Sequence, residues 1–133
     1  MISNASNVQI KNIVKLQKNA RTRREQDAFV IEGKKLFEEA KLYGKVKRAY
    51  VTPEYIAELE TSEEKYFSGI EYELVEEKVL KEAADTKTPQ GILAIVEKPH
   101  YTLDSILSGE SVNLLLLEDL RDPGNLGTIL RTA

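Results

Sequence analysis

Two spacings of hydrophobic residues alternate along this chain, one typical of helices and one typical of strands. Apolar residues three and four positions apart predict a first helix that begins at Ser6 or Asn7 and ends near Ala20. The same spacing predicts further helices at 36–43, 53–59 and 76–84. Shorter apolar runs predict strands at 28–32, 46–52, 70–75 and 91–96, with exposed polar loops at 19–27 and 86–90. Alternating strands and helices of this length predict an α/β layered domain.

The C-terminal part of the chain has a different pattern. Residues 99–111 form a polar linker in which a short helix can fit, and 112–117 form an unbroken apolar run typical of a strand in a parallel sheet. A helix is predicted from Asn125 to Ala133, and it ends without the glycine or basic last turn that commonly closes a helix. We therefore expect one domain over 1–98, a linker over 99–111 and the truncated start of a second domain over 112–133.

The composition is that of an ordinary globular protein. Of the 133 residues, 41% are hydrophobic and 31% are charged. No apolar run approaches the roughly 20 residues that a membrane-spanning helix needs, and the polar N-terminus does not resemble a secretory signal. The lack of cysteine excludes disulfides and thiolate metal sites, and the single histidine, His100, does not suffice for a metal site. We expect a cytoplasmic protein without a metal or a membrane partner.

Charge is distributed unevenly along the chain. Residues 1–48 contain 12 Lys and Arg against 5 Asp and Glu, whereas residues 49–133 contain 7 against 17. This asymmetry indicates one basic face on an acidic body, which is a common property of proteins that bind a phosphate backbone. Solvated helix faces without any binding role would produce the same pattern.

The segment 118–133 combines a turn with the start of a helix. The tripeptide Asp122–Gly124 favours a tight turn, and Asn125 is a good helix cap. Gly127 leaves room for a close approach, and Arg131, six residues into the helix, is a candidate phosphate contact. Because α/β folds bind substrates at such helix N-termini, the segment predicts a functional site. A well-capped connection without a ligand fits the same residues.

The sequence DPGNLGTILRTA at 122–133 resembles the first signature of the SpoU/TrmH family of RNA ribose 2′-O-methyltransferases. Asn125, Gly127, Arg131 and Ala133 match that signature in order and spacing. The preceding part, with a basic helix, an arginine-rich loop, FVIEG and later TPQGILAIV, is similar to the substrate-binding domain of many family members. The resemblance implies the three-layer α/β sandwich of kink-turn-binding ribosomal proteins, followed by the first strand and helix of a knotted methyltransferase domain.

The activity implied by the resemblance is S-adenosylmethionine-dependent methylation of a ribose 2′-hydroxyl in rRNA or tRNA, with structured rRNA the favoured partner. In this family the cofactor lies in a trefoil knot whose later signatures do not occur in this sequence. No cofactor-binding residue is therefore assigned, and the chain alone is expected to be inactive. Asn125 and Arg131 are the catalytic candidates, with the permanently protonated Arg131 expected to clamp an RNA phosphate. The full-length enzyme is expected to be a homodimer and this chain a monomer.

The candidate RNA contacts come from the basic region and from one loop. The basic residues expected to gather near one end of the first domain are Lys11, Lys15, Lys18, Arg21, Arg23, Arg24 and Lys34. Phosphate contacts of this kind give affinity but little sequence information. In the loop that ends at Gly91, Lys87 and Gln90 are expected to reach a bulged nucleotide. The six tyrosines are available for base stacking, but we expect most of them to pack inside the protein.

Two other functions remain open at the level of sequence. A stand-alone RNA-binding adaptor of the kink-turn type would need the same basic residues and no catalysis. An α/β protein-interaction module with an incidental basic face would need neither RNA contacts nor catalytic residues. Salt-dependent RNA binding separates both RNA hypotheses from the third.

Overall fold

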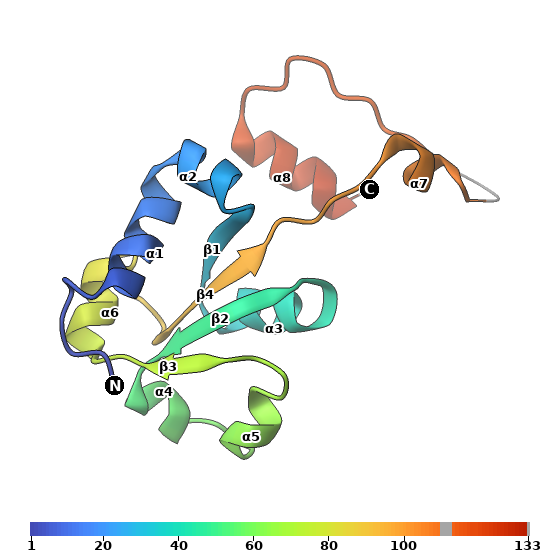
Figure 1. Ribbon diagram of the computed structural model, residues 1–133. Helices are drawn as coiled ribbons and strands as arrows, with labels where there is room; N and C mark the ends of the chain where they lie inside the picture. Colours follow the sequence, from blue (N-terminus) through green and yellow to red (C-terminus); the bar gives the residue numbers. More distant parts are fainter. Residues whose placement is uncertain (110–112, 133) are drawn as a thin grey trace. The chain divides into compact units, whose positions relative to one another are not determined.

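The computed structural model describes residues 1–109 and 113–132, and the chain divides into two units, Met1–Pro99 and His100–Ala133. Figure 1 shows the first unit built around a sheet, with helices on both of its faces. The assignment of the units to an RNA-binding domain and to the start of a methyltransferase domain stays a prediction.

Four strands form the sheet, and all four lie where the sequence predicts them. They are β1 (Ala28–Glu32), β2 (Val46–Val51), β3 (Tyr72–Leu74) and β4 (Ile92–Glu97), arranged in the order β1-β4-β2-β3. Strand β4 is antiparallel to both β1 and β2, whereas β3 is parallel to β2. The sheet is therefore mixed, and the C-terminal ends of β1, β2 and β3 lie at the same edge as the start of β4.

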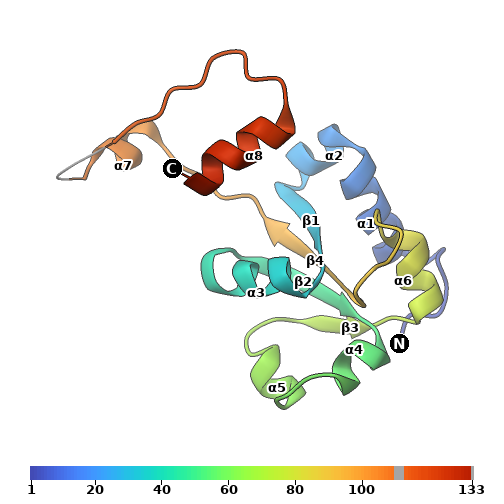
Figure 2. The same cartoon turned by 180° about the vertical axis from the view of Figure 1, so that it is seen from behind.

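Helices cover both faces of this sheet and complete three layers (Figures 1 and 2). On one face lie α1 (Val8–Lys18) and α6 (Glu77–Ala83), and on the other lie α3 (Lys34–Tyr43), α4 (Pro53–Ala57) and α5 (Glu63–Tyr66). Alternating strand residues supply the two cores, because successive side chains of a strand point to opposite faces. The predicted three-layer sandwich is confirmed.

The α1 side of the sheet shows how the apolar spacing becomes a core. Ile13 and Leu16 are fully buried, and they pack with Leu80 of α6 against the strand residues Leu93 and Ile95. The helix begins where the sequence predicts, because the Asn7 side chain accepts a hydrogen bond from the Gln9 amide at 2.8 Å.

The predicted loop at 19–27 is wrong, because the structure has a second helix, α2 (Ala20–Glu25). The Asn19 side chain accepts hydrogen bonds from the amides of Arg21 and Thr22 and so satisfies two donors of the first turn. Arg21 also forms an ion pair with Glu25 at 2.7 Å, at the i, i+4 spacing of neighbouring turns. Local capping thus makes a helix of a stretch that has no apolar face.

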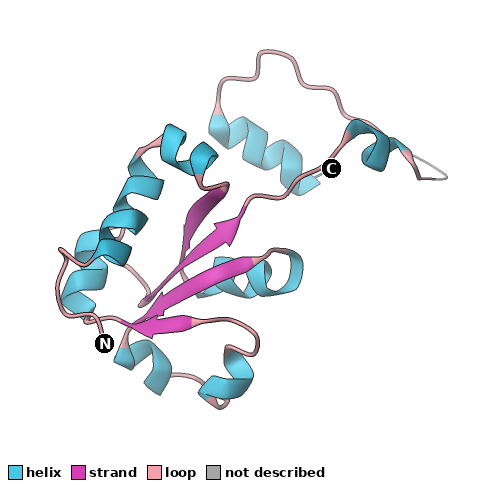
Figure 3. Cartoon of the chain, in the orientation of Figure 1, coloured by secondary structure: helices cyan, strands magenta, loops and turns pink. Residues whose placement is uncertain are grey.

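The second unit contains α7 (Leu103–Leu107) and α8 (Pro123–Thr132). The strand predicted at 112–117 is wrong for 113–117, which Figure 3 draws as loop, while Val112 lies outside the described residues. A strand needs a neighbour for its backbone hydrogen bonds, and the described residues of this unit include no other strand. Leu116 is consequently 95% exposed. No described helix is long and apolar enough to cross a membrane.

Helix α8 begins two residues earlier than predicted. Pro123 occupies its first position, and the Asp122 carboxylate accepts hydrogen bonds from the amides of Gly124 at 3.3 Å and Asn125 at 2.9 Å. Asp122 is therefore the cap, and the predicted capping role of Asn125 is wrong. Proline is favoured at the first helical position because its missing N–H would have no partner there.

Candidate nucleic-acid interface

Five of the predicted RNA contacts lie on the exposed surface of α1 and α2, which we call the basic helical face: Lys11, Lys15, Lys18, Arg21 and Arg24. The three lysines lie on α1, and their spacing places them on neighbouring turns. Helix α2 continues this surface toward the start of β1. Since phosphate contacts require only accessible positive charge, these side chains can follow an RNA backbone.

Arg23 differs from its neighbours because it is turned inward. Its Nη1 donates to the main-chain oxygens of Leu16 at 2.8 Å and Gln17 at 2.7 Å, near the end of α1. These carbonyls belong to the last turn of the helix, where no helical amide follows to bind them. We therefore assign Arg23 a structural role at the junction of α1 and α2, although the sequence alone does not distinguish it from Arg24.

The predicted gathering of all basic residues at one end of the domain is wrong for Lys34. Helix α2 precedes β1, whereas Lys34 follows it, and the five residues of β1 span about 16 Å. Lys34 instead lies with Lys87 and Gln90 at the sheet edge where β1 and β2 end and β4 begins. The structure thus divides the candidates between two places.

At this second place the loop 85–90 is tied to the junction of β1 and α3, and we call the assembly the tethered loop. Glu32 accepts hydrogen bonds from the amides of Asp85 and Thr86 and from the Thr86 hydroxyl. At the other end of the loop, Gln90 Oε1 accepts from the Lys34 amide at 3.1 Å. Lys87 lies between these two anchors, so the loop holds the positive charge of Lys87 near the start of α3.

Gly33 makes the second anchor geometrically possible. Its φ of 96° and ψ of 156° belong to a backbone region used almost only by glycine. A Cβ at this position would lie 2.8 Å from Gln90 Oε1. Gly33 has no side chain with which to cap α3, so Gln90, which lies 56 residues beyond Lys34, supplies the cap.

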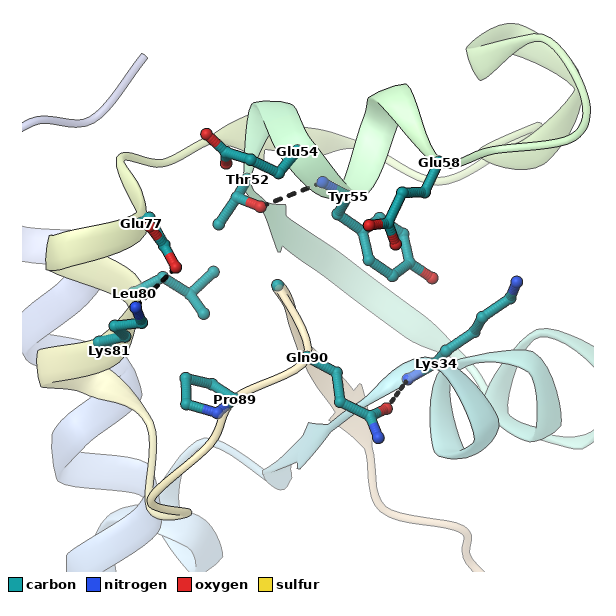
Figure 4. A pocket seen from close by; sticks show the side chains of 11 residues that line it. Lys34, Thr52, Glu54, Tyr55, Glu58, Glu77, Leu80, Lys81, Pro89 and Gln90 are labelled. Atoms are coloured by element: carbon teal, nitrogen blue, oxygen red, sulfur yellow. Dashed lines mark hydrogen bonds and ion pairs between the residues drawn. The ribbon is translucent and has the colours of Figure 1, made fainter.

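A hollow of about 450 Å³ lies beside the tethered loop, between α3, α4 and α6 (Figure 4). Its charged side chains are the carboxylates of Glu54, Glu58 and Glu77 and the ammonium groups of Lys34 and Lys81. Glu77 and Lys81 form an ion pair at 2.6 Å. With three carboxylates against two cations, the hollow does not favour phosphate. Phosphate contacts are better placed on the outer side of the loop.

That outer side has a smaller hollow of about 320 Å³, lined among others by Lys35, Thr86 and Thr88. Glu32 also lines it, but its carboxylate is engaged by the loop. Lys35 is thus a candidate contact that the sequence analysis missed. The signal was present, since Lys35 follows Lys34 directly after the glycine that ends the strand.

The tyrosines are divided between the core and the surface. Tyr50, Tyr55 and Tyr66 are buried as expected, whereas Tyr43 and Tyr101 are exposed. The hydroxyls of Tyr55 and Tyr66 lie 2.6 Å apart in a hydrogen bond. Burial is the main cause that raises the pKa of both groups above the ordinary value, and in Tyr66 a hydrogen bond to Glu38 adds to it. Burial in the core excludes stacking of RNA bases on Tyr55 and Tyr66.

The two catalytic candidates do not share a face of α8. Six residues separate Asn125 from Arg131, which corresponds to a rise of about 9 Å and a rotation of about 240°. The Arg131 guanidinium folds back along the helix, where its Nη2 donates to Thr128 Oγ1 at 3.4 Å. It lies over Gly127, whose missing side chain leaves the room. Their catalytic roles stay predictions, and Ala133, the last position of the signature, lies outside the described residues.

Comparisons with known proteins agree with this geometry. Residues 7–94 match the family described as the MRM3-like substrate binding domain. The sequence is 34% identical to human mitochondrial rRNA methyltransferase 3 over 93% of this chain and 30% of that protein. It is 35% identical to the Bacillus subtilis 23S rRNA (guanosine(2553)-2′-O)-methyltransferase RlmP, over 99% of this chain and 49% of that protein.

Comparison of the fold with solved structures also finds rRNA methyltransferases. The structure of an AdoMet-bound rRNA methyltransferase from Sinorhizobium meliloti superimposes with a TM-score of 0.75 and 31% identity, over 98% of this chain and 49% of that one. The chain therefore spans about a third to a half of the length of these relatives. The resemblance to SpoU/TrmH RNA methyltransferases is confirmed. The chain belongs to the MRM3-like substrate binding domain family.

Proposed function

We propose that this chain is the RNA-binding portion of an S-adenosylmethionine-dependent rRNA ribose 2′-O-methyltransferase. The names of its relatives support the reaction and favour rRNA over tRNA as the substrate. The observation that carries the RNA-binding role is the tethered loop, which brings Lys34, Lys35 and Lys87 to one sheet edge on a framework of hydrogen bonds. The basic helical face supplies a second set of phosphate contacts.

The chemistry assigns different tasks to different parts of the protein. A ribose 2′-hydroxyl is a poor nucleophile and must lose its proton as it takes the methyl group, so it needs an oriented phosphate or water as acceptor. S-adenosylmethionine supplies the methyl group when bound. Arg131 would clamp an RNA phosphate and orient the ribose, since a guanidinium stays protonated and is a poor base. We assign no residue of this chain to the cofactor, because the later signatures that form the cofactor-binding knot in the resembling family do not occur in this sequence.

Fluorescence anisotropy tests the RNA-binding role. The probe is a labelled 23S rRNA hairpin containing the nucleotide that corresponds to guanosine 2553, the target in the name of RlmP. Replacing Lys35 and Lys87 together by Ala should weaken binding about tenfold and reduce the slope of log K against log salt by about two. The matched control replaces Lys65 and Lys78, two exposed lysines outside the tethered loop, and should change affinity less than about twofold.

Equal effects of the two double variants would refute the assignment of the tethered loop. Failure of the unaltered chain to bind the hairpin below about 10 μM at about 0.1 M salt would favour the protein-interaction module. An assay for transfer of a tritiated methyl group to rRNA distinguishes the methyltransferase from the stand-alone adaptor. The whole protein should catalyse it, and a whole protein that binds RNA without methyl transfer would be an adaptor.

Two further proposals concern the whole protein. We propose that it is a homodimer, which sedimentation equilibrium tests directly. We also propose a cytoplasmic location, supported by the cysteine-free sequence, and imaging of a fluorescent fusion tests it. Mitochondrial localisation of the fusion, as the name of the human relative describes for that protein, would refute the second proposal.

A further inference from the structure

A hollow of about 420 Å³ lies on the α1 side of the sheet, and we call it the amide hollow. Its polar lining consists of Gln9, Asn12, Gln26, Lys47, Arg48 and Tyr50. We propose that it binds the base of one unstacked RNA nucleotide, while the neighbouring basic helical face holds the adjoining phosphates. The inference rests on the proposed RNA-binding function and adds to it a site for reading the RNA.

The size and floor of the amide hollow suit a single base. Its volume lies within the range of about 300–1,000 Å³ typical of small-molecule sites. The floor is formed by buried residues of three adjacent strands, Ala28, Tyr50 and Ile95. Proteins that recognise RNA by sequence mostly take up bases that have left the helical stack, since the deep, narrow major groove of paired RNA does not admit side chains.

The walls offer the groups that read a base edge. Asn12 Nδ2 donates to Gln26 Oε1 at 3.1 Å, and Gln26 Nε2 donates to Asn12 Oδ1 at 2.6 Å, which fixes both amides in a reciprocal pair. Each amide nitrogen has a second N–H, and each oxygen has a second lone pair, for a ligand. Arg48 Nη1 donates to Gln9 Oε1 at 3.5 Å. The NH₂ group of Gln9 therefore points away from Arg48 and is available to a ligand. Asn and Gln side chains are the usual partners of adenine edges.

The charge around the amide hollow distinguishes it from the hollow beside the tethered loop. No carboxylate is among its lining residues in the described part of the chain, whereas three line the other. Arg48 forms ion pairs with Glu71 and, at 3.8 Å, with Glu73, neither of which lines the hollow. The hydrogen bond to Glu71 is the main cause that raises the pKa of Arg48. Arg48 therefore orients Gln9, and the net positive charge comes from Lys47 and the basic helical face.

A fold irregularity places Lys47 at the rim. The pairing of β2 with β4 shifts between Val46 and Arg48, so Lys47 is the extra residue of a bulge. Its Nζ donates to the main-chain oxygen of Gln26 at 3.2 Å, at the end of α2. The bulge thus directs a lysine toward the basic helical face, although the residue belongs to a central strand of the sheet.

Two RNA hairpins test the proposal, one fully paired and one with a single unpaired adenosine, both titrated into the ¹⁵N-labelled chain. The side-chain NH₂ signals of Gln9, Asn12 and Gln26 should shift with the bulged hairpin and not with the paired one. Gln9→Ala should weaken binding of the bulged hairpin about tenfold and leave the paired one within about twofold. Gln17→Ala, on the same helix outside the hollow, should change neither.

Each remaining result overturns a specific statement. If both hairpins bind but the three NH₂ signals stay unmoved, or move equally with both, the amide hollow does not bind a base although RNA binding stands. If neither hairpin binds, the proposed RNA-binding function fails together with the hollow. Unchanged backbone amide signals in Gln9→Ala away from α1 serve as the control that the variant is folded.

Discussion

Gly33→Ala is the sharpest single test of how the tethered loop is held. A non-glycine residue in the backbone region of Gly33 costs about 1–3 kcal/mol. The added Cβ would also lie 2.8 Å from Gln90 Oε1 and would displace it from the Lys34 amide. Losing that hydrogen bond costs about 1 kcal/mol, so we expect the free energy of unfolding to fall by about 2–4 kcal/mol.

A matched control separates the backbone cost from the clash. Gly69 also has a positive φ, 75°, but a Cβ built on it meets no atom within 4 Å. Gly69→Ala should therefore show the cost of a positive φ without a clash. Urea unfolding followed by circular dichroism should find Gly33→Ala less stable than Gly69→Ala by at least about 1 kcal/mol, because Gly33 also lies in a backbone region that is almost exclusive to glycine.

Gln90→Ala completes a double-mutant cycle. With Gln90 shortened, the Cβ added at position 33 has no side-chain oxygen to displace, so the double variant should cost about 1 kcal/mol less than the sum of the single ones. Strict additivity, or a loss below about 0.5 kcal/mol for Gly33→Ala, would refute the reasoning. RNA affinity measured on the same variants should fall with Gly33→Ala, because the loop that carries Lys87 loses its second anchor.

Two further predictions concern residues whose roles the structure separates. Arg23→Ala should lower the free energy of unfolding by about 1–2 kcal/mol, since it removes two hydrogen bonds to carbonyls of α1, whereas Arg24→Ala should change it by less than about 0.5 kcal/mol and weaken RNA binding instead. Equal stability of the two variants in urea would contradict this. The pKa of Tyr66 is raised in the folded protein, so its contribution to stability is fully present below about pH 10 and is lost as the pH rises above that value. Tyr66→Phe should cost about 1 kcal/mol at about pH 7 through the lost hydrogen bond to Tyr55, and its stability should decline less steeply between about pH 10 and 11 in urea titrations. A decline as steep as in the unaltered protein would show that Tyr66 is not the responsible group.

Local signals carried most of the fold prediction. The start of α1 at Asn7 and of α4 at Pro53 follow from capping and from proline geometry, which act within a few residues. The prediction failed at α2 because side-chain caps can sustain a helix that has no apolar face. It failed at 113–117 for the opposite reason, since an apolar run becomes a strand only when another strand pairs with it.

The sequence by itself determined the positions of the four strands and of most helices of the first unit, the uneven charge and the resemblance to RNA methyltransferases. Tertiary structure alone decided how the candidate site is divided. Lys34 and Arg24 are ten residues apart, yet β1 carries them to opposite edges of the sheet. Gln90 and Lys34 are 56 residues apart, yet the pairing of β4 with β1 joins them. Capping and periodicity act over a few residues, whereas strand order depends on contacts between distant parts of the chain, so the site could be located only in the folded protein.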